Sequence, residues 1–396
     1  MSIANKKLNK HITHLKLYFR NCPICNSNKK RRILKVQNWK KINSNNQIYA
    51  FDKKYCICLN CNLIYTSPTV KPHIFDKLYE NSIVGSFFQG NNNKNNIKIK
   101  VFKKIAINFL EKDNNILEIG SGNGVLLKFL SKKYKKKNLL GIEPSKKIYN
   151  FFKKNKYFKI RNIFLNKLSD KKKFNFIIMD NVFEHFEYPS KCLKKISKIL
   201  QTNGLIYIAI PNSRKMDIIQ NDPFNHTCNY NINNIKILLN NNNFKILKHY
   251  QNYNQIYLVA KKQKNRLLRF KNDSKFLDII LSKIKLIKAR LREVKLKIKK
   301  IKIDIINNKK KIVIFGSGNY ALWILDLFKI DQSILYGVDN NVLYHNRVRN
   351  NIKIYHPRKL LLNNYDYILI LSGMFKSEII NQIKKMNIDE KKILTI

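Results

Sequence analysis

The feature that most constrains the fold is a short apolar segment joined directly to a glycine-rich turn. Ile116-Leu-Glu-Ile is predicted to be a buried strand, Gly120-Ser-Gly-Asn-Gly124 follows it at once, and a helix is expected over 125–130. Glycines let the backbone turn tightly and approach a ligand, and the start of a helix presents free N–H groups. Alone, such a unit is a weak signal, because Rossmann-like α/β folds bind many different nucleotides.

The surrounding residues make the prediction more specific. From 76 to 262 apolar runs alternate with helical patterns, which is typical of a parallel α/β sheet. The next expected strand, 138–143, ends in Glu143, about twenty residues after the glycines, where an acid suits the two hydroxyls of a ribose. A later strand, 174–180, continues into Asn181-Val-Phe-Glu-His185.

Together these segments resemble the class I S-adenosylmethionine-dependent methyltransferases. The resemblance rests on the E-x-G-x-G-x-G run, the following acid, and the segment that contains Glu184, His185 and Pro189. It implies S-adenosylmethionine as cofactor. Its methionine portion would be surrounded by Glu118, Gly120, Gly122 and Gly124, its ribose held by Glu143, its adenine near Ile163, and Asn181 beside the methionine end. Asn175 departs from the family, which usually has Asp before that strand, and another nucleotide ligand is the alternative.

A metal centre is predicted near the N-terminus. Cys22-Pro-Ile-Cys25 and Cys58-Leu-Asn-Cys61 are two C-x-x-C pairs, which can place four thiolates around a structural Zn²⁺ at about 2.3 Å each. Strand alternation puts Cys56 on the same face as Cys58, so Cys56 is an alternative ligand. Cysteines buried as small apolar residues are the other alternative. We therefore expect a basic segment over 1–21 and a zinc-ribbon-like module over 22–75.

A basic segment without Gly or Pro, 263–309, separates the two α/β regions and is expected to be a long amphipathic helical linker. Apolar residues step by three and four from Leu277 to Ile305, which predicts a long amphipathic helix over 277–305. A coiled coil that joins two chains as a homodimer is one interpretation. The favoured interpretation is a helix that packs its seam onto its own domains, because additional apolar residues widen the stripe.

A second strand–glycine–helix unit begins at Lys311, so 310–396 is expected to be a smaller Rossmann-like domain. Gly316 and Gly318 form the turn, and Asp339 ends the next strand, which satisfies the G-x-G-x-x-A dinucleotide pattern. This unit could bind the nucleotide of a sugar donor, a nicotinamide cofactor, or nothing. We favour the first or the last, because no acid–base partner for hydride transfer stands out.

The order of the three parts resembles one methyltransferase subgroup, which includes C-methyltransferases of nucleotide-linked deoxyketosugars. That resemblance implies a nucleotide-linked sugar as substrate and His226 as the base that removes a proton beside a ketone. Asn225 stands where the subgroup has Glu, which also favours the alternative of an O- or N-methyltransferase for another metabolite. His185 is a second catalytic candidate, with a core or cofactor-shelf role as the alternative.

The formal net charge of +55 indicates either an anionic partner or compositional drift. The lysines are spread along the whole chain, so we expect a weakly selected solvated surface, and a basic nucleic-acid-binding protein is the alternative class. The first residues lack the apolar run of a signal peptide. No run of roughly eighteen apolar residues occurs, which predicts a soluble, cytoplasmic protein without a membrane partner.

Overall fold

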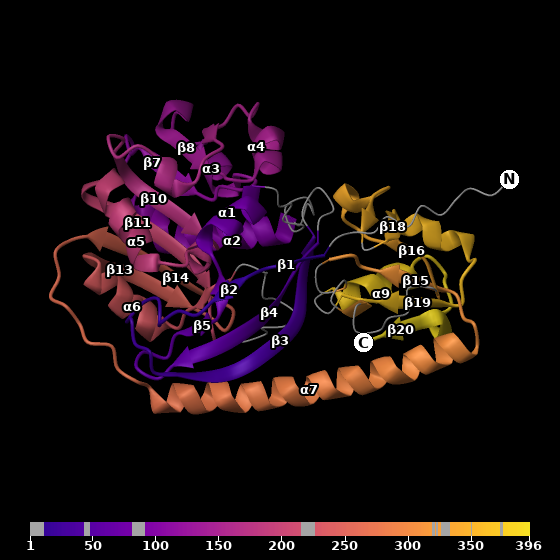
Figure 1. The fold of residues 1–396 in the computed structure, drawn as a ribbon. Coiled ribbons are helices and arrows are strands. Elements are labelled where there is room, and N and C mark those ends of the chain that lie inside the picture. The colour runs from indigo at the N-terminus through magenta and orange to yellow at the C-terminus, as the bar shows by residue number, and fades with distance from the viewer. Residues whose placement is uncertain are drawn as a thin grey trace.

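The computed structural model describes residues 12–42, 48–80, 92–214, 226–318, 321, 324–325, 333–349, 351–372 and 375–396. In Figure 1 the central α/β domain lies at the left, the N-terminal sheet below it, and the C-terminal α/β domain at the right. The long helix α7 (Ser274–Asn307) runs beneath all three. The expected mixed α/β fold is confirmed.

The central domain is built on a seven-stranded sheet in the order β13-β14-β11-β10-β7-β8-β9. Neighbouring strands are parallel except β14, which is antiparallel to β11 and β13. The strand order reverses direction at β7, and parallel α/β sheets bind ligands beside the carboxyl ends of strands at such a point. The strands are β7 (Ile116–Ile119), β8 (Leu139–Ile142), β9 (Lys159–Arg161), β10 (Phe174–Asp180), β11 (Leu200–Pro211), β13 (Phe244–Gln251) and β14 (Gln255–Lys262).

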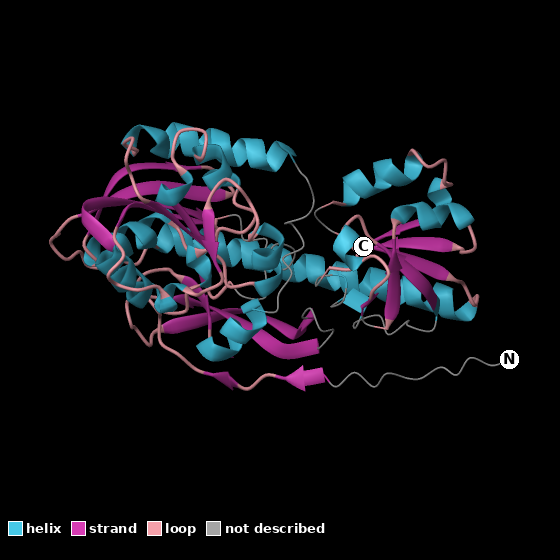
Figure 2. Ribbon diagram, turned by 90° about the horizontal axis from the view of Figure 1, so that it is seen from above, coloured by secondary structure: helices cyan, strands magenta, loops and turns pink. Residues whose placement is uncertain are grey.

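Helices cover both faces of this sheet (Figure 2). In α5, Pro189 starts the helix, and Cys192, Leu193, Ile196 and Ile199 repeat at helical spacing, so the side chains of one stripe are all buried. On the other face of the sheet, helices pack against a separate apolar core that contains Phe102. The helices are α2 (Asn92–Ala106), α3 (Val125–Leu130), α4 (Lys146–Phe152), α5 (Pro189–Ile199) and α6 (Ile232–Asn241).

The N-terminal sheet has the order β1-β4-β5-β12, with β3 paired to β4. Its first strand precedes Cys22, and its last comes from beyond residue 225, so the sheet extends past the expected range 22–75 in both directions. The strands are β1 (Ile12–His14), β3 (Lys30–Ile42), β4 (Ile48–Cys58), β5 (Ile64–Thr66) and β12 (Cys228–Asn229). A two-stranded sheet of β2 (Leu17–Tyr18) and β6 (Thr69–Val70), and helix α1 (Pro72–Glu80), complete this part.

Helix α7 packs its apolar seam onto its own chain, as the favoured interpretation held. Ile280, Ile284, Ile298 and Ile305 are buried in one apolar cluster that also contains residues of the N-terminal sheet and of the C-terminal domain. Asp273 caps the helix by accepting a hydrogen bond from the backbone N–H of Phe276 at 2.9 Å. Residues 263–273 are not helical. A homodimer through this helix stays a prediction.

The C-terminal domain has a six-stranded sheet in the order β17-β18-β16-β15-β19-β20, parallel except for β17. Its strands are β15 (Ile312–Phe315), β16 (Ile334–Val338), β17 (Val348–Arg349), β18 (Ile352–Tyr355), β19 (Tyr367–Ile370) and β20 (Ile393–Thr395), and helix α9 spans Lys376–Lys384. The strand and the glycine turn of the predicted second strand–glycine–helix unit are therefore present, and most of the helix expected after the turn lies outside the described residues.

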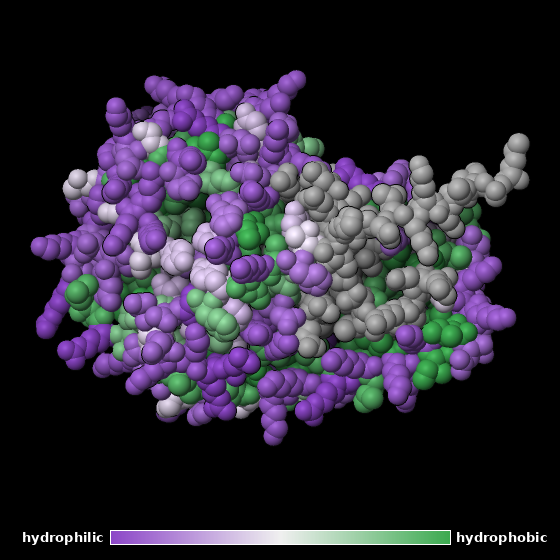
Figure 3. Space-filling model, in the orientation of Figure 1, coloured by the Kyte–Doolittle hydropathy of each residue, from purple (hydrophilic) through white to green (hydrophobic). Residues whose placement is uncertain are grey.

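Hydrophilic side chains cover most of the face shown in Figure 3, and hydrophobic residues lie between them in small separate groups. This matches lysines spread along the chain. Within the described ranges, no helix combines the length and the apolarity needed to cross a membrane.

Candidate functional site

The glycine turn after β7 has a backbone that few other residues adopt. Gly120 and Gly124 have φ values of +64° and +65°, where a side chain is strained. A Cβ on Gly120 would lie 2.6 Å from Cγ2 of Val182, and one on Gly124 would lie 2.2 Å from the ring of Phe158. Gly122 also has a positive φ, +54°. The turn, which we call the cradle, therefore requires glycines for its own geometry, because Val182 and Phe158 fill the space that side chains at Gly120 and Gly124 would need.

The acid at the end of the next strand braces this turn. Glu143 accepts hydrogen bonds from the backbone N–H of Gly122 at 3.0 Å and of Ser145 at 2.9 Å. Burial raises the pKa of Glu143, and these two bonds oppose that rise. Asn162 donates to the carbonyl of Glu143 at 2.8 Å, which brings the segment of Ile163 beside it. The structure thus brings Glu143, Ile163 and the glycine turn together.

A group of charged residues lies beside the ends of β7 and β10. Nζ of Lys98, from α2, lies 2.8 Å from Oδ2 of Asp180. Burial raises the pKa of Glu118 to about 7, although Lys98 opposes the rise. Oε2 of Glu118 is buried without a hydrogen-bond partner in the described residues. Asn181, with φ of +55°, donates to Asp180 at 2.7 Å and accepts from Gln255 at 3.0 Å.

The two predicted catalytic histidines lie side by side. The ring centroids of His185 and His226 are 4.6 Å apart, and Nε2 of His226 lies 3.6 Å from Oε1 of Glu184. The ring of Tyr79 meets His185 edge to face at 5.6 Å. Burial lowers the pKa of His226 well below its usual value and raises that of Glu184 to about 8. The imidazole of His226 is therefore neutral near pH 7 and can accept a proton.

Backbone pairing places His226 at this position. The N–H of Thr227 donates to the carbonyl of Glu184 at 3.2 Å, and β12 pairs with β5, Cys228 opposite Tyr65. Asn225, on which the choice of acceptor partly depended, lies outside the described residues. A carboxylate is nevertheless present beside the imidazole, because Glu184 comes to it from another segment.

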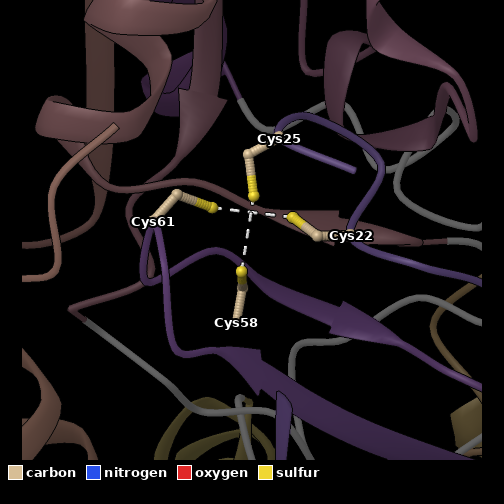
Figure 4. A group of neighbouring side chains, drawn as sticks. All are labelled: Cys22, Cys25, Cys58 and Cys61. Carbon is tan, nitrogen blue, oxygen red and sulfur yellow. Dashed lines mark hydrogen bonds between the residues drawn. The ribbon is translucent and has the colours of Figure 1, made fainter. Parts of the chain in front are cut away.

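The four predicted metal ligands converge (Figure 4). Sγ of Cys22 lies 3.5 Å from Sγ of Cys61, and Sγ of Cys25 lies 3.5 Å from Sγ of Cys58. All four sulfur atoms lie within 4.8 Å of one another. Four sulfurs about 2.3 Å from one Zn²⁺ would be roughly 3.8 Å apart, so this set fits a tetrahedral site.

Hydrogen bonds among the thiols favour ionisation of two of them. A hydrogen bond with Cys22 is the main cause that lowers the pKa of Cys25 and of Cys58, the latter to about 7, and thiolate is the form that binds metal. Cys56 takes no part, since its Sγ lies 3.5 Å from the carbonyl oxygen of Ser67. The cysteine centre in the structure therefore consists of Cys22, Cys25, Cys58 and Cys61.

In the second glycine turn, the carboxylate of Asp339 is hydrogen-bonded to residues of the same domain. Asp339 accepts from the N–H and the hydroxyl of Ser317 at 2.7 and 2.8 Å, and from the N–H of Asn341 at 2.8 Å. Gly316 has φ of +99°, and a Cβ on Gly318 would meet nothing within 4 Å. The buried Arg349 donates from Nε to the carbonyl of Ser317 at 2.9 Å. A cationic side chain thus lies next to the turn.

Several residues of the site escaped the sequence analysis. Lys98 lies in a helix without a motif, and Tyr79 is far from the glycine turn in sequence. Asp180 is the last residue of a strand that the sequence predicts. A polar residue at the carboxyl end of a parallel strand is a pattern that could have marked it as part of the site. Asn175 keeps the local bonds that its departure put in question: its side chain accepts from the N–H of Asn115 and donates to Gln201, both at 2.8 Å.

Residues 96–249 match the family described as "Methyltransferase domain", and residues 308–394 match "C2185-like, N-terminal". The chain therefore contains a methyltransferase domain and is a methyltransferase. No curated protein matched the sequence.

Solved structures similar to the chain include several methyltransferases. One is an S-adenosylmethionine-dependent methyltransferase from Clostridium acetobutylicum (16% identity, TM-score 0.34, 48% of this chain and 97% of that chain). Another is the Burkholderia thailandensis 1,6-didemethyltoxoflavin-N1-methyltransferase with bound S-adenosylhomocysteine (12%, 0.40, 53% and 96%). A third is the Synechocystis magnesium protoporphyrin IX methyltransferase with bound S-adenosylmethionine (14%, 0.33, 43% and 80%).

Metal analysis tests the cysteine centre. We expect about one zinc per chain, because four thiolates fill a tetrahedral structural site. Cys22→Ser should lose the metal and lower the melting temperature of the N-terminal part, whereas Cys56→Ser should retain the metal. Plasma emission spectrometry and circular dichroism provide the measurements. A folded, metal-free protein, or metal loss in both variants, would contradict the assignment.

Gly120→Ala tests the cradle. The positive φ and the 2.6 Å approach to Val182 both disfavour the alanine, and a distortion of roughly 1–2 kcal/mol should weaken S-adenosylhomocysteine binding about tenfold or more. Val182→Ala in the same chain should restore part of the affinity by removing the clash. Gly318→Ala is the matched control. Calorimetric titration measures all three, and equal affinity in Gly120→Ala and wild type would refute the site.

Glu184 should make stability depend on pH. Its pKa of about 8 in the folded protein lies above the ordinary value of 4.5, so its contribution to stability is greatest at low pH and falls as pH rises toward 8. Between pH 5 and 9 the free energy of unfolding should fall by up to about 4 kcal/mol more in wild type than in Glu184→Gln. Urea unfolding at both pH values measures the difference, and parallel curves would show that Glu184 is not buried as described.

Proposed function

We propose that the protein transfers a methyl group from S-adenosylmethionine to a carbon beside a ketone in a nucleotide-linked sugar. The observation that carries the proposal is the buried pair of His226 and Glu184, placed just beyond the end of β10 and close to the glycine turn. We also propose that the cysteine centre binds a structural Zn²⁺, because four thiolates leave no position for a reacting water.

The groups that the cofactor requires would come from the carboxyl ends of β7 and β10 and from the turn after β7. Glycines let the cradle make its tight turn with positive φ, and the cofactor would bind along that backbone. Oε2 of Glu118, which has no hydrogen-bond partner among the described residues, offers an acceptor for the amino group of the methionine portion. Glu143 retains lone pairs for the ribose hydroxyls beyond the two bonds it accepts from the backbone. When bound, S-adenosylmethionine supplies an electrophilic methyl group.

Proton removal falls to His226. Its Nε2 is directed toward Glu184, so the proton on the substrate carbon would pass to Nδ1 as the C–H bond breaks. The electrons of that bond would form an enolate, whose carbon would take up the methyl group as the methyl–sulfur bond breaks and S-adenosylhomocysteine leaves with that electron pair on its sulfur. An ionised Glu184 would stabilise the imidazolium that results. Two imidazoles and a carboxylate also form a ligand set for divalent metals, but ligation would occupy the base that carbon methylation needs.

Tyr79 is suited to stabilising the enolate oxygen. Its ring packs edge to face on His185, and burial raises its pKa well above the usual value, so the phenol stays protonated and can donate. His185 would then hold Tyr79 and His226 in position. The nucleotide of the substrate would bind at the C-terminal turn of Gly316 and Gly318, where the cationic Arg349 favours phosphate.

A proton-exchange assay tests the base. With thymidine diphosphate-4-keto-6-deoxyglucose as probe in D₂O, we expect His226→Asn to slow exchange at the carbon beside the ketone and methyl incorporation by roughly 10²–10⁴-fold. The wild-type rate should rise with pH through about 8 as Glu184 ionises, and Glu184→Gln should abolish that rise. Cofactor affinity should be unchanged.

His249→Asn is the matched control, since His249 is an exposed residue on the same domain. Mass spectrometry and two-dimensional NMR locate the methyl group. A methyl group on oxygen or nitrogen, or full activity in His226→Asn, would refute carbon methylation through this base.

A further inference from the structure

Arg20 connects the cysteine centre with the proposed catalytic residues. It lies two positions before Cys22, its side chain is 5% exposed, and its guanidinium lies over the ring of Tyr65 at 5.6 Å. Burial of an arginine is costly unless its donors are satisfied. The partners of those donors therefore show what the residue does.

The guanidinium donates to three backbone carbonyls from three separate segments. Nε donates to Thr66 at 3.0 Å, Nη1 to Glu187 at 3.0 Å and Nη2 to Thr227 at 2.8 Å. Thr66 ends β5 of the cysteine module, Glu187 follows the Glu184–His185 segment, and Thr227 follows His226. Oε1 of Glu187 also lies 3.8 Å from Nη1, with both side chains 5% exposed. One planar group thus joins the two segments that supply the catalytic side chains.

The remaining contacts of these segments converge on the same place. The N–H of Thr66 donates to the carbonyl of Thr227 at 3.2 Å, so that carbonyl receives two bonds. The N–H of Thr227 donates to the carbonyl of Glu184 at 3.2 Å. If the guanidinium were absent, the carbonyls of Glu187 and Thr227 would each lose a charged donor in a buried setting, which is unfavourable.

We propose that Arg20 is a positioning residue for the base, on the assumption that His226 acts as proposed above. It fixes the separation between Glu184 and His226, and the cysteine centre fixes the backbone from which Arg20 reaches them. The Cys22–Cys25 turn therefore affects proton removal indirectly, by holding Arg20 in position. Lysine cannot replace arginine here, because a single ammonium lacks the planar set of donors that reaches three carbonyls.

The test compares Arg20→Ala, Arg20→Lys and the control Arg31→Ala in the full chain. Arg31 is an exposed arginine on β3 of the same module. In Arg20→Ala we expect amide hydrogen exchange of 184–188 and 226–230 to accelerate at least about tenfold, with zinc content and S-adenosylhomocysteine affinity within about twofold of wild type. Arg20→Lys should give an intermediate acceleration, and Arg31→Ala none.

Catalysis provides the second measurement. With the ketosugar probe, kcat of Arg20→Ala should fall about 10-fold or more while KM for the cofactor is retained, as expected when an interaction specific to the reacting geometry is lost. Millimolar guanidinium should restore part of kcat in Arg20→Ala and none in His226→Asn. A variant damaged only in folding would lose metal and cofactor binding as well, and guanidinium would not rescue it.

The outcomes separate this proposal from the proposed function. If wild type fails to methylate the ketosugar but amide exchange in the two segments still accelerates in Arg20→Ala, the proposed function is wrong. The structural role of Arg20 in holding the two segments together is then right. Unchanged exchange in both segments would overturn the positioning role, as would equal loss of kcat in Arg31→Ala. If Arg20→Ala does not fold, unaltered exchange and kcat in Arg20→Lys would also overturn it.

Discussion

The short pairing of β12 with β5 is the interaction on which the site depends. Cys228 lies opposite Tyr65 and Asn229 opposite Ile64, so chain from the methyltransferase domain becomes the outer strand of the cysteine module's sheet. Apolar packing continues across this junction, because Tyr65 belongs to the same core as Phe183 and Tyr230. His226 lies two residues before this strand. Its position is therefore set by the N-terminal module as much as by the domain that holds the glycine turn.

Burial then gives the paired groups their chemistry. In water a histidine is half protonated near pH 6.5 and a glutamate is ionised, so an exposed pair would carry opposite charges and attract counter-ions. Inside the protein, burial disfavours both charged forms, and His226 and Glu184 are held as a neutral pair. A neutral imidazole is the form that accepts a proton. Burial of His226 thus keeps it in the form that accepts a proton, and the carboxylate of Glu184 becomes useful only once the imidazole is charged.

Structural features that depend on neighbouring residues in the chain could be predicted from the sequence. The strand and turn of 116–124, the cysteine pairs and the long helix all depend on local spacing, and they fold as expected. Contacts between distant segments were not predictable. The sequence predicts that a carboxylate is missing at Asn225, yet Glu184 reaches His226 from 42 positions earlier (226 − 184). The partners of Arg20 are likewise carbonyls of residues that share no motif. Only the strand order and β12 pairing bring these groups together, and neither follows from periodicity.

The two glycine turns also show what an acid at the end of the second strand does. Glu143 accepts from the N–H of Gly122 and of Ser145, and Asp339 accepts from Ser317 and Asn341. In both cases the acid ties the turn to the residue two positions beyond itself. The same strand–turn–acid pattern therefore has a purely structural reason to exist. Ribose binding can use only the lone pairs that remain, so the pattern identifies the fold more firmly than it identifies a nucleotide.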